Sequence, residues 1–157
     1  MDSLQSFRNL FAYDHWANHA ALASLSGIDG AAEKPLKMFA HVLGASRVWQ
    51  SRFDDPNPPN VQPWPALALD QADLAVDEIY QRWLTLLDRF TEEKLSDNLV
   101  YRTTQGAQFE TPVRDVFTHL LMHSAYHRGQ VAAAVREAGG KPAATDYVFF
   151  LRQRSAQ

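Results

Sequence analysis

The sequence contains no cysteine, and this absence narrows the chemistry open to the protein. Disulfide bonds, thiolate metal ligands and a cysteine nucleophile are all excluded. A bound metal ion must therefore be held by histidine, carboxylate, carbonyl or water ligands. Any thiol that takes part in a reaction must come from outside the chain.

The sequence also lacks a basic excess and a long apolar run. It has 15 Lys and Arg against 18 Asp and Glu, for a net charge of −3 with neutral histidines. Nucleic acids and anionic membranes attract clustered positive charge, so we expect neither as a partner. No segment approaches the ~20 apolar residues of a membrane span. The first residues do not resemble a signal peptide, so a cytoplasmic location is expected.

Apolar residues recur at helical spacing in four segments, at about 3–25, 35–53, 70–92 and 112–138. Three local signals support these boundaries. Pro35 suits a first helical position, Asp70 suits an N-cap, and Thr111–Pro112 and Gly139–Gly140 suit the start and end of the last helix. A chain of 157 residues fits one domain over 1–157.

The connections between these segments differ in kind. Five prolines interrupt residues 54–70, which must form a long crossover outside the helices (Pro56, Pro58, Pro59, Pro63 and Pro65). Residues 98–110 predict a short hairpin around Gln105–Gly106. The tail at 145–154 favours a short helix with Asp146 near its start. Together these features predict an all-α fold, a four-helix bundle with a Pro-rich crossover between the second and third helices.

Three histidines stand four residues apart in HLLMHSAYHRGQV, at His119, His123 and His127. Residues four apart lie one turn apart on the same helix face, whereas residues eight apart are separated by ~12 Å along the axis. One ion can therefore use His119 with His123, or His123 with His127. Relative to the apolar stripe, His127 lies about 30° from the centre, His123 about 70° and His119 about 110°. The pair His123/His127 is therefore predicted to point inward.

A metal site of this kind usually has three protein ligands. His41 is the best third candidate because it shares an apolar face of the second helix, although a histidine there is more often a core residue. His15 and His19, also four residues apart, are rival candidates. Asp14 and Asn18 lie on the inward stripe of the same helix. Polar side chains that point inward need partners. These two either support the metal site or form hydrogen bonds to a neighbouring helix or a dimer partner.

Three segments resemble the DinB superfamily. HLLMHSAYHRGQVAAAVREAGGKPAATDYVFFLR carries the H-x-x-x-H-R-G-Q pattern, followed by Gly-Gly, Pro and Thr-Asp before an aromatic tail. HVLGASRVWQSRF resembles the second helix of that family, with Trp eight and Arg eleven positions after the histidine. YDHWANHAAL resembles its first helix. The three segments occur in the family's order and cover nearly the whole chain.

The resemblance implies an up-up-down-down four-helix bundle that is usually a homodimer. It also implies a divalent ion, zinc or nickel, held by His41, His123 and His127. His119 matches a position that is not a ligand in relatives.

Three residues follow the last of these histidines, and each has its own interpretation. Arg128 points away from the apolar stripe, which predicts a salt bridge on the surface or at a dimer interface. Gly129 suits a close helix contact. Gln130 lies on the ligand side and can orient a histidine or a bound water.

Two functional hypotheses follow. The first is a metal-binding DinB-like protein that acts as a metal-dependent transferase, because a metal ion lowers the pKa of a bound low-molecular-weight thiol and presents its sulfur as a nucleophile. The second is a non-enzymatic, damage-inducible stress-response dimer whose metal is structural or incidental. Partners expected from the sequence are a second copy of the chain and a small molecule or thiol.

Overall fold

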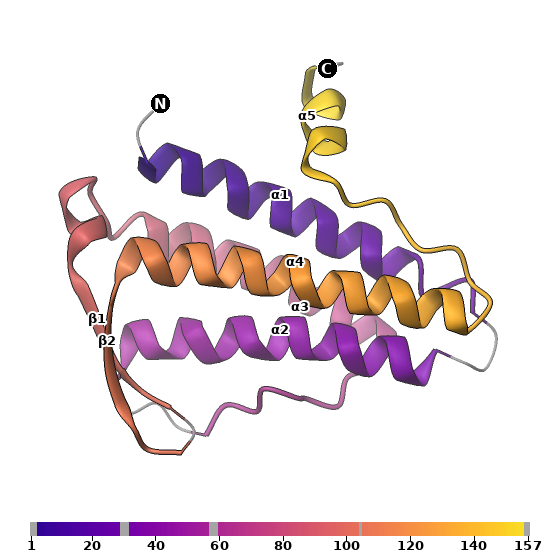
Figure 1. Ribbon diagram of the computed structural model, residues 1–157, viewed down its shortest axis with the longest axis horizontal. Helices are drawn as coiled ribbons and strands as arrows, with labels where there is room; N and C mark the ends of the chain where they lie inside the picture. The colour runs from indigo at the N-terminus through magenta and orange to yellow at the C-terminus, as the bar shows by residue number, and fades with distance from the viewer. Residues whose placement is uncertain (1–2, 29–31, 57–59, 104, 156–157) are drawn as a thin grey trace.

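Four long helices lie side by side in the computed structural model, which describes residues 3–28, 32–56, 60–103 and 105–155 (Figure 1). They are α1 (Ser3–Ala23), α2 (Glu33–Asp54), α3 (Leu69–Leu87) and α4 (Val113–Glu137). The 3-10 helix η1 (Glu93–Ser96) and the strands β1 (Asn98–Arg102) and β2 (Gln108–Pro112) stand between α3 and α4, and α5 (Tyr147–Ser155) ends the described chain. The prediction of a mainly α-helical fold is confirmed.

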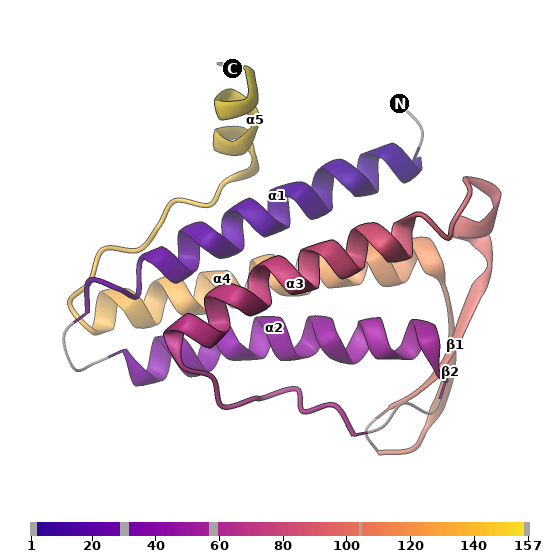
Figure 2. The same ribbon diagram turned by 180° about the vertical axis from the view of Figure 1, so that it is seen from behind.

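The helices α2 and α3 run in the same direction, and α1 and α4 run opposite to them (Figures 1 and 2). Two ion pairs between α2 and α3 show this: Arg47 of α2 lies 3.1 Å from Glu78 of α3, and Asp54, later in α2, pairs with Arg82, later in α3. The chain therefore follows an up-down-down-up order, and the predicted up-up-down-down order is wrong. That order needs two long crossovers, whereas this chain has one, between the parallel helices α2 and α3.

Part of the apolar core is a cluster of aromatic rings to which all four long helices contribute. Phe117 of α4 is fully buried. Its ring lies 5.3–6.1 Å, centroid to centroid, from the rings of Phe7, Phe11, Phe53, Trp83 and Phe90. Full burial of a large apolar side chain contributes about 1.5–3 kcal/mol, and Phe11, Trp83 and Phe117 are buried to this degree. This cluster fixes the relative positions of α2 and α4, and hence of the side chains that they carry further along.

The helix starts differ from the sequence prediction in detail. The second helix begins at Glu33, so Pro35 lies within its first turn instead of at its first position. Ala68, not Asp70, is the N-cap of α3, and its backbone N–H donates to the side chain of Gln71 at 2.9 Å. Asp70 therefore lies in the first turn of α3, where its negative charge interacts favourably with the helix dipole.

The end of α4 and the segments beside it match the prediction more closely. The helix stops before Gly139, whose φ of +80° is a left-handed conformation that suits glycine. The predicted hairpin is present, with antiparallel pairing from Asn98↔Pro112 to Arg102↔Gln108. Its start was predicted correctly, but β2 extends beyond residue 110 and runs directly into α4, so Pro112 becomes the N-cap.

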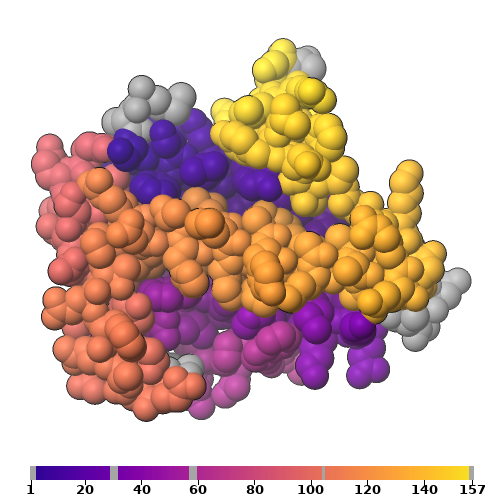
Figure 3. Space-filling model, viewed as in Figure 1, coloured from indigo at the N-terminus to yellow at the C-terminus, as the bar shows by residue number. Residues whose placement is uncertain are grey.

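The tail forms the predicted short helix, α5, which projects from the bundle beside α1 (Figures 1 and 3). Its inner side is anchored by Phe150, whose ring lies 5.9 Å from that of Tyr13 on α1. Several large apolar side chains of α5 are exposed (Tyr147, Val148, Phe149 and Leu151). Within the described residues, no helix is long and apolar enough to cross a membrane.

Candidate metal centre

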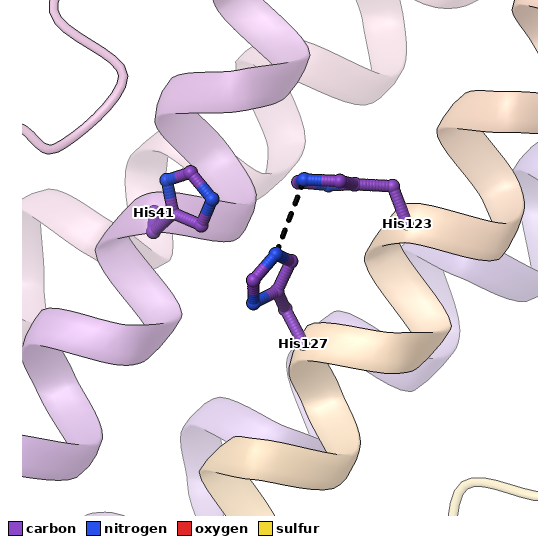
Figure 4. Close-up of side chains that lie close together, drawn as sticks. All are labelled: His41, His123 and His127. Atoms are coloured by element: carbon purple, nitrogen blue, oxygen red, sulfur yellow. Dashed lines mark hydrogen bonds between the residues drawn. The ribbon is translucent and has the colours of Figure 1, made fainter.

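Three histidines from two helices meet between α2 and α4 (Figure 4). One ring nitrogen from each of His41, His123 and His127 lies within 4.8 Å of the others. The two Nε2 atoms of His123 and His127 are 3.1 Å apart. The His41 ring lies 4.5 Å from that of His127 and 5.3 Å from that of His123, centroid to centroid. These are the three residues that the sequence predicted as ligands.

Helix geometry explains how these side chains converge. His123 and His127 are one turn apart on α4 and therefore share a face. The antiparallel neighbour α2 presents His41 to the same level, where the side chain is 9% exposed. The two α4 histidines are half-buried, so the cluster opens to solvent on their side.

The His41 ring is oriented by the crossover that follows α2. Its Nδ1 lies 2.8 Å from the carbonyl oxygen of Pro63. A carbonyl only accepts, so Nδ1 carries the hydrogen and Nε2 keeps its lone pair. The Trp64 ring also stacks on the imidazole, with centroids 3.9 Å apart and planes 11° apart. Both contacts hold the ring in one orientation.

Gly44 makes this contact possible. It lies three residues after His41, and a Cβ at that position would come 2.5 Å from the Pro63 oxygen and 2.6 Å from the Pro65 ring. Only glycine allows the crossover to approach the helix so closely. Sequence reasoning missed Gly44, Pro63 and Trp64 because the register of a non-helical crossover against a helix has no periodic signal. A glycine on the face of His41 was the one available hint.

The His127 ring is oriented in a similar way from its own helix. Its Nδ1 lies 2.8 Å from Oε1 of Gln130, three residues later. The contact that the sequence suggested for Gln130 is therefore present. A second partner on the far nitrogen fixes the tautomer of a metal-binding histidine and directs the other nitrogen to the ion.

Burial favours the neutral form of two rings in the cluster, those of His123 and His41. Burial lowers the pKa of His123 to about 4, helped by the neighbouring His127, His41 and His119. Burial also lowers the pKa of His41, against the opposing effect of its hydrogen bond to Pro63. Metal ions bind the neutral form of imidazole. At neutral pH these two rings are therefore in the state that a metal ion requires.

His119 lies one turn away on the exposed side of α4 and does not belong to the cluster. Its ring contacts Trp49, with centroids 5.4 Å apart. Burial lowers its pKa, and the charge of Arg52 adds to the effect. This placement agrees with the phase expected for His119, about 110° from the centre of the apolar stripe.

Arg128 is buried, at 3% exposure, so the predicted surface or dimer-interface salt bridge is wrong. Its side chain reaches across to α1, where it forms an ion pair with Asp14 and donates to Asn18 Oδ1 at 2.9 Å. It also donates to Ser124 Oγ at 2.6 Å. The buried face of α4 is wide enough to contact both α1 and α2. The sequence estimate measured angles from a single centre of that face and therefore placed Arg128 outside it.

The same contacts decide between the two interpretations of Asp14 and Asn18. Both residues bond to Arg128 of α4, so the alternative of hydrogen bonds to a neighbouring helix is confirmed. Gly129 is exposed, and a Cβ there would meet no heavy atom of the described chain within 4 Å. The predicted close helix contact at Gly129 is therefore wrong.

His15 and His19 do not supply a ligand to this cluster. They face α3 instead, where they form a separate group with Asp77.

Comparison with known proteins places the chain in a family. The profile of the DinB family matches residues 33–156, so the chain belongs to the DinB family. Protein DinB of Bacillus subtilis (strain 168) is 30% identical over 81 residues, which are 48% of this chain and 47% of that protein. The alignment thus spans about half the length of this relative. No solved structure matches significantly.

Proposed function

We propose that the protein is a DinB-like four-helix bundle that binds one divalent ion, zinc or nickel, through His41, His123 and His127. The observation that carries the proposal is the convergence of three ring nitrogens within 4.8 Å. The donor set fits such an ion, because imidazole suits both metals. The Nδ1 contacts of His41 and His127 leave their Nε2 atoms available for it.

The three neutral ligands leave the positive charge of a bound ion uncompensated, so the ion would acidify a coordinated water or thiol. Beside His123, an open depression on α4 gives a small molecule access (lined by Asp115, Thr118, His119, Met122, His123 and Tyr126). The chain has no thiol of its own. We therefore favour a metal-dependent transferase that takes a low-molecular-weight thiol from solution.

A structural role for the metal is the second candidate. His41 is tied to the crossover through Pro63 and Trp64, so an ion held by the three histidines would fasten α2, α4 and the crossover together. In this alternative the protein is a non-enzymatic, damage-inducible stress-response dimer.

Metal analysis of the purified protein tests the site. We expect one tightly held ion in the wild type that is lost in His41→Ala and His127→Ala. His119→Ala is the matched control, because it removes a histidine of α4 outside the cluster and leaves binding unchanged. Folding is checked by circular dichroism. Equal metal content in all four proteins would refute the site.

Calorimetry with glutathione, bacillithiol and mycothiol then separates the two functions. Thiol binding that disappears with a chelator supports the transferase. If no thiol binds and His41→Ala fails to fold, the metal is structural.

Homodimerisation and a cytoplasmic location are further parts of the proposal. The exposed apolar side chains of α5 and of Met122 and Tyr126 on α4 offer a surface for a second copy. Sedimentation at micromolar concentration measures the oligomeric state, and a monomer throughout would contradict a dimer.

A further inference from the structure

A second cluster of possible ligands lies between α1 and α3, apart from the first. His15 Nε2 is 2.7 Å from Asp77 Oδ1, and His19 Nε2 is 2.9 Å from the same oxygen. The two Nε2 atoms are 3.2 Å apart. Two nitrogens and one carboxylate oxygen therefore face a common point.

This cluster repeats the construction of the first. In each, one helix supplies two histidines four residues apart, with Nε2 atoms 3.1 Å apart on α4 and 3.2 Å apart on α1. In each, an antiparallel neighbour supplies the third group, His41 from α2 or Asp77 from α3. The sequence contained a signal for the second: Asp73 and Asp77 have the same spacing of four on α3.

The surroundings of the second cluster also resemble those of the first. His15 stacks on Tyr80, with centroids 4.3 Å apart and planes 15° apart, as His41 stacks on Trp64. Asp73 Oδ1 lies 3.4 Å from Nδ1 of His19 and can hold that ring, as Gln130 holds His127. These contacts orient the rings with Nε2 toward Asp77.

The ligand separations suit a small transition-metal ion. Nitrogen and oxygen ligands lie about 2.0–2.2 Å from zinc, which places tetrahedral ligands about 3.3 Å from one another. The observed 2.7–3.2 Å needs only a slight opening of the three side chains. Hydrogen bonds from His15 and His19 lower the pKa of Asp77, so its carboxylate is charged and able to bind a cation.

We propose that His15, His19 and Asp77 form a second divalent transition-metal site. Two imidazoles and a carboxylate select ions such as zinc, nickel or copper over magnesium or calcium, which prefer oxygen ligands. The three side chains are 26%, 36% and 62% exposed, so the ion would be exchangeable and would keep solvent ligands. His15 and His19 lie outside residues 33–156, so the inference goes beyond the family match and the proposed function.

Zinc titration of the metal-free full-length protein by calorimetry tests the second site. We expect two ions per wild-type chain and one in Asp77→Asn or His19→Ala. The single variant His41→Ala should also bind one ion, at the second site. The double variant His41→Ala/Asp77→Asn should bind none. Loss of the carboxylate should remove the second binding event from the titration.

Asp70→Asn is the matched control, because it removes the same charge from the same helix outside the cluster. NMR spectra of the imidazole nitrogens give an independent readout: zinc should shift the His15 and His19 Nε2 signals in the His41→Ala variant as well. One ion per wild-type chain at saturation would overturn the second site. A second ion bound equally well by Asp77→Asn and Asp70→Asn would also overturn it.

Failure of the first site has a different signature, because His41→Ala would then retain every ion that the wild type binds. The two proposals can therefore fail separately.

Discussion

A Cβ on Gly44 would lie 2.5 Å from the carbonyl oxygen of Pro63, which is closer than side-chain carbons approach carbonyls. The same oxygen accepts the Nδ1 hydrogen of His41. The missing side chain of Gly44 thus allows the contact that orients the imidazole of His41, three residues earlier.

Gly44→Ala should therefore weaken zinc binding without removing any ligand. The added methyl pushes the crossover outward and breaks the bond from His41 to Pro63, so we expect affinity to fall about 10–100-fold. Overpacking should also lower the free energy of unfolding by about 1–3 kcal/mol. A competition titration with a chromophoric chelator measures the affinity.

The control for this change is Gly129→Ala, where a Cβ meets no atom of the described chain within 4 Å. It should leave zinc affinity unchanged and stabilise α4 by about 0.5–1 kcal/mol through helix propensity. Equal affinities in the two variants would contradict a role for Gly44.

Gln130 allows a test of ligand orientation within α4. Gln130→Leu removes the acceptor for His127 Nδ1, 2.8 Å away, and should lower zinc affinity about tenfold. Gln130→Glu keeps an acceptor and should bind at least as tightly as the wild type, since a carboxylate raises the basicity of the ring. The idea fails if Leu and Glu give the same dissociation constant.

The lowered histidine pKa values predict a pH dependence of stability in the metal-free protein. His123 titrates at about 4 in the folded state, mainly because of burial, and near 6.5 in the unfolded chain. Between these values the unfolded chain binds more protons, so the free energy of unfolding falls as the pH drops from 6.5 to 4. Above pH 6.5 this contribution no longer changes.

Urea unfolding with chelator present, at pH 7 and at pH 5, measures the difference. His123→Gln should show a smaller drop between the two pH values than the wild type. An identical drop in both proteins would assign the acid sensitivity to other groups.

Arg128→Met should destabilise the protein by about 3 kcal/mol, because it leaves the partly buried carboxylate of Asp14 without its ion-pair partner. Arg8→Met, which breaks the exposed pair with Asp88, should cost less than about 1 kcal/mol. Adding Asp14→Leu to Arg128→Met should restore part of the loss. Chemical denaturation measures all three, and equal effects of the two arginine variants would exclude a special role for the buried pair.

The features that depend on helical periodicity could be predicted from the sequence. Four helices, their approximate limits and the inward direction of His123 and His127 all follow from spacing of 3.6 residues per turn. His41 followed from its place on an apolar face, together with the need for a third ligand. The hairpin and the final helix followed from local turn and cap signals.

Relations between helices were harder to predict. The direction of α2 relative to α3 depends on which links are long, and the resemblance suggested another order. The burial of Arg128 was not predicted, because its angle was measured from one apolar stripe, whereas α4 contacts both α1 and α2. The pairing of His15 and His19 with Asp77 required knowing that α1 and α3 are antiparallel neighbours.

The parallel direction of α2 and α3 has a consequence for how the candidate metal centre can vary. A parallel pair obliges the chain to travel back the full length of a helix, and here that return path lies over His41. Changes in the length or sequence of this segment would alter how firmly that imidazole is held while leaving the helical framework intact. We therefore expect variants of this return path to change the metal affinity of the candidate site while its three histidines stay the same.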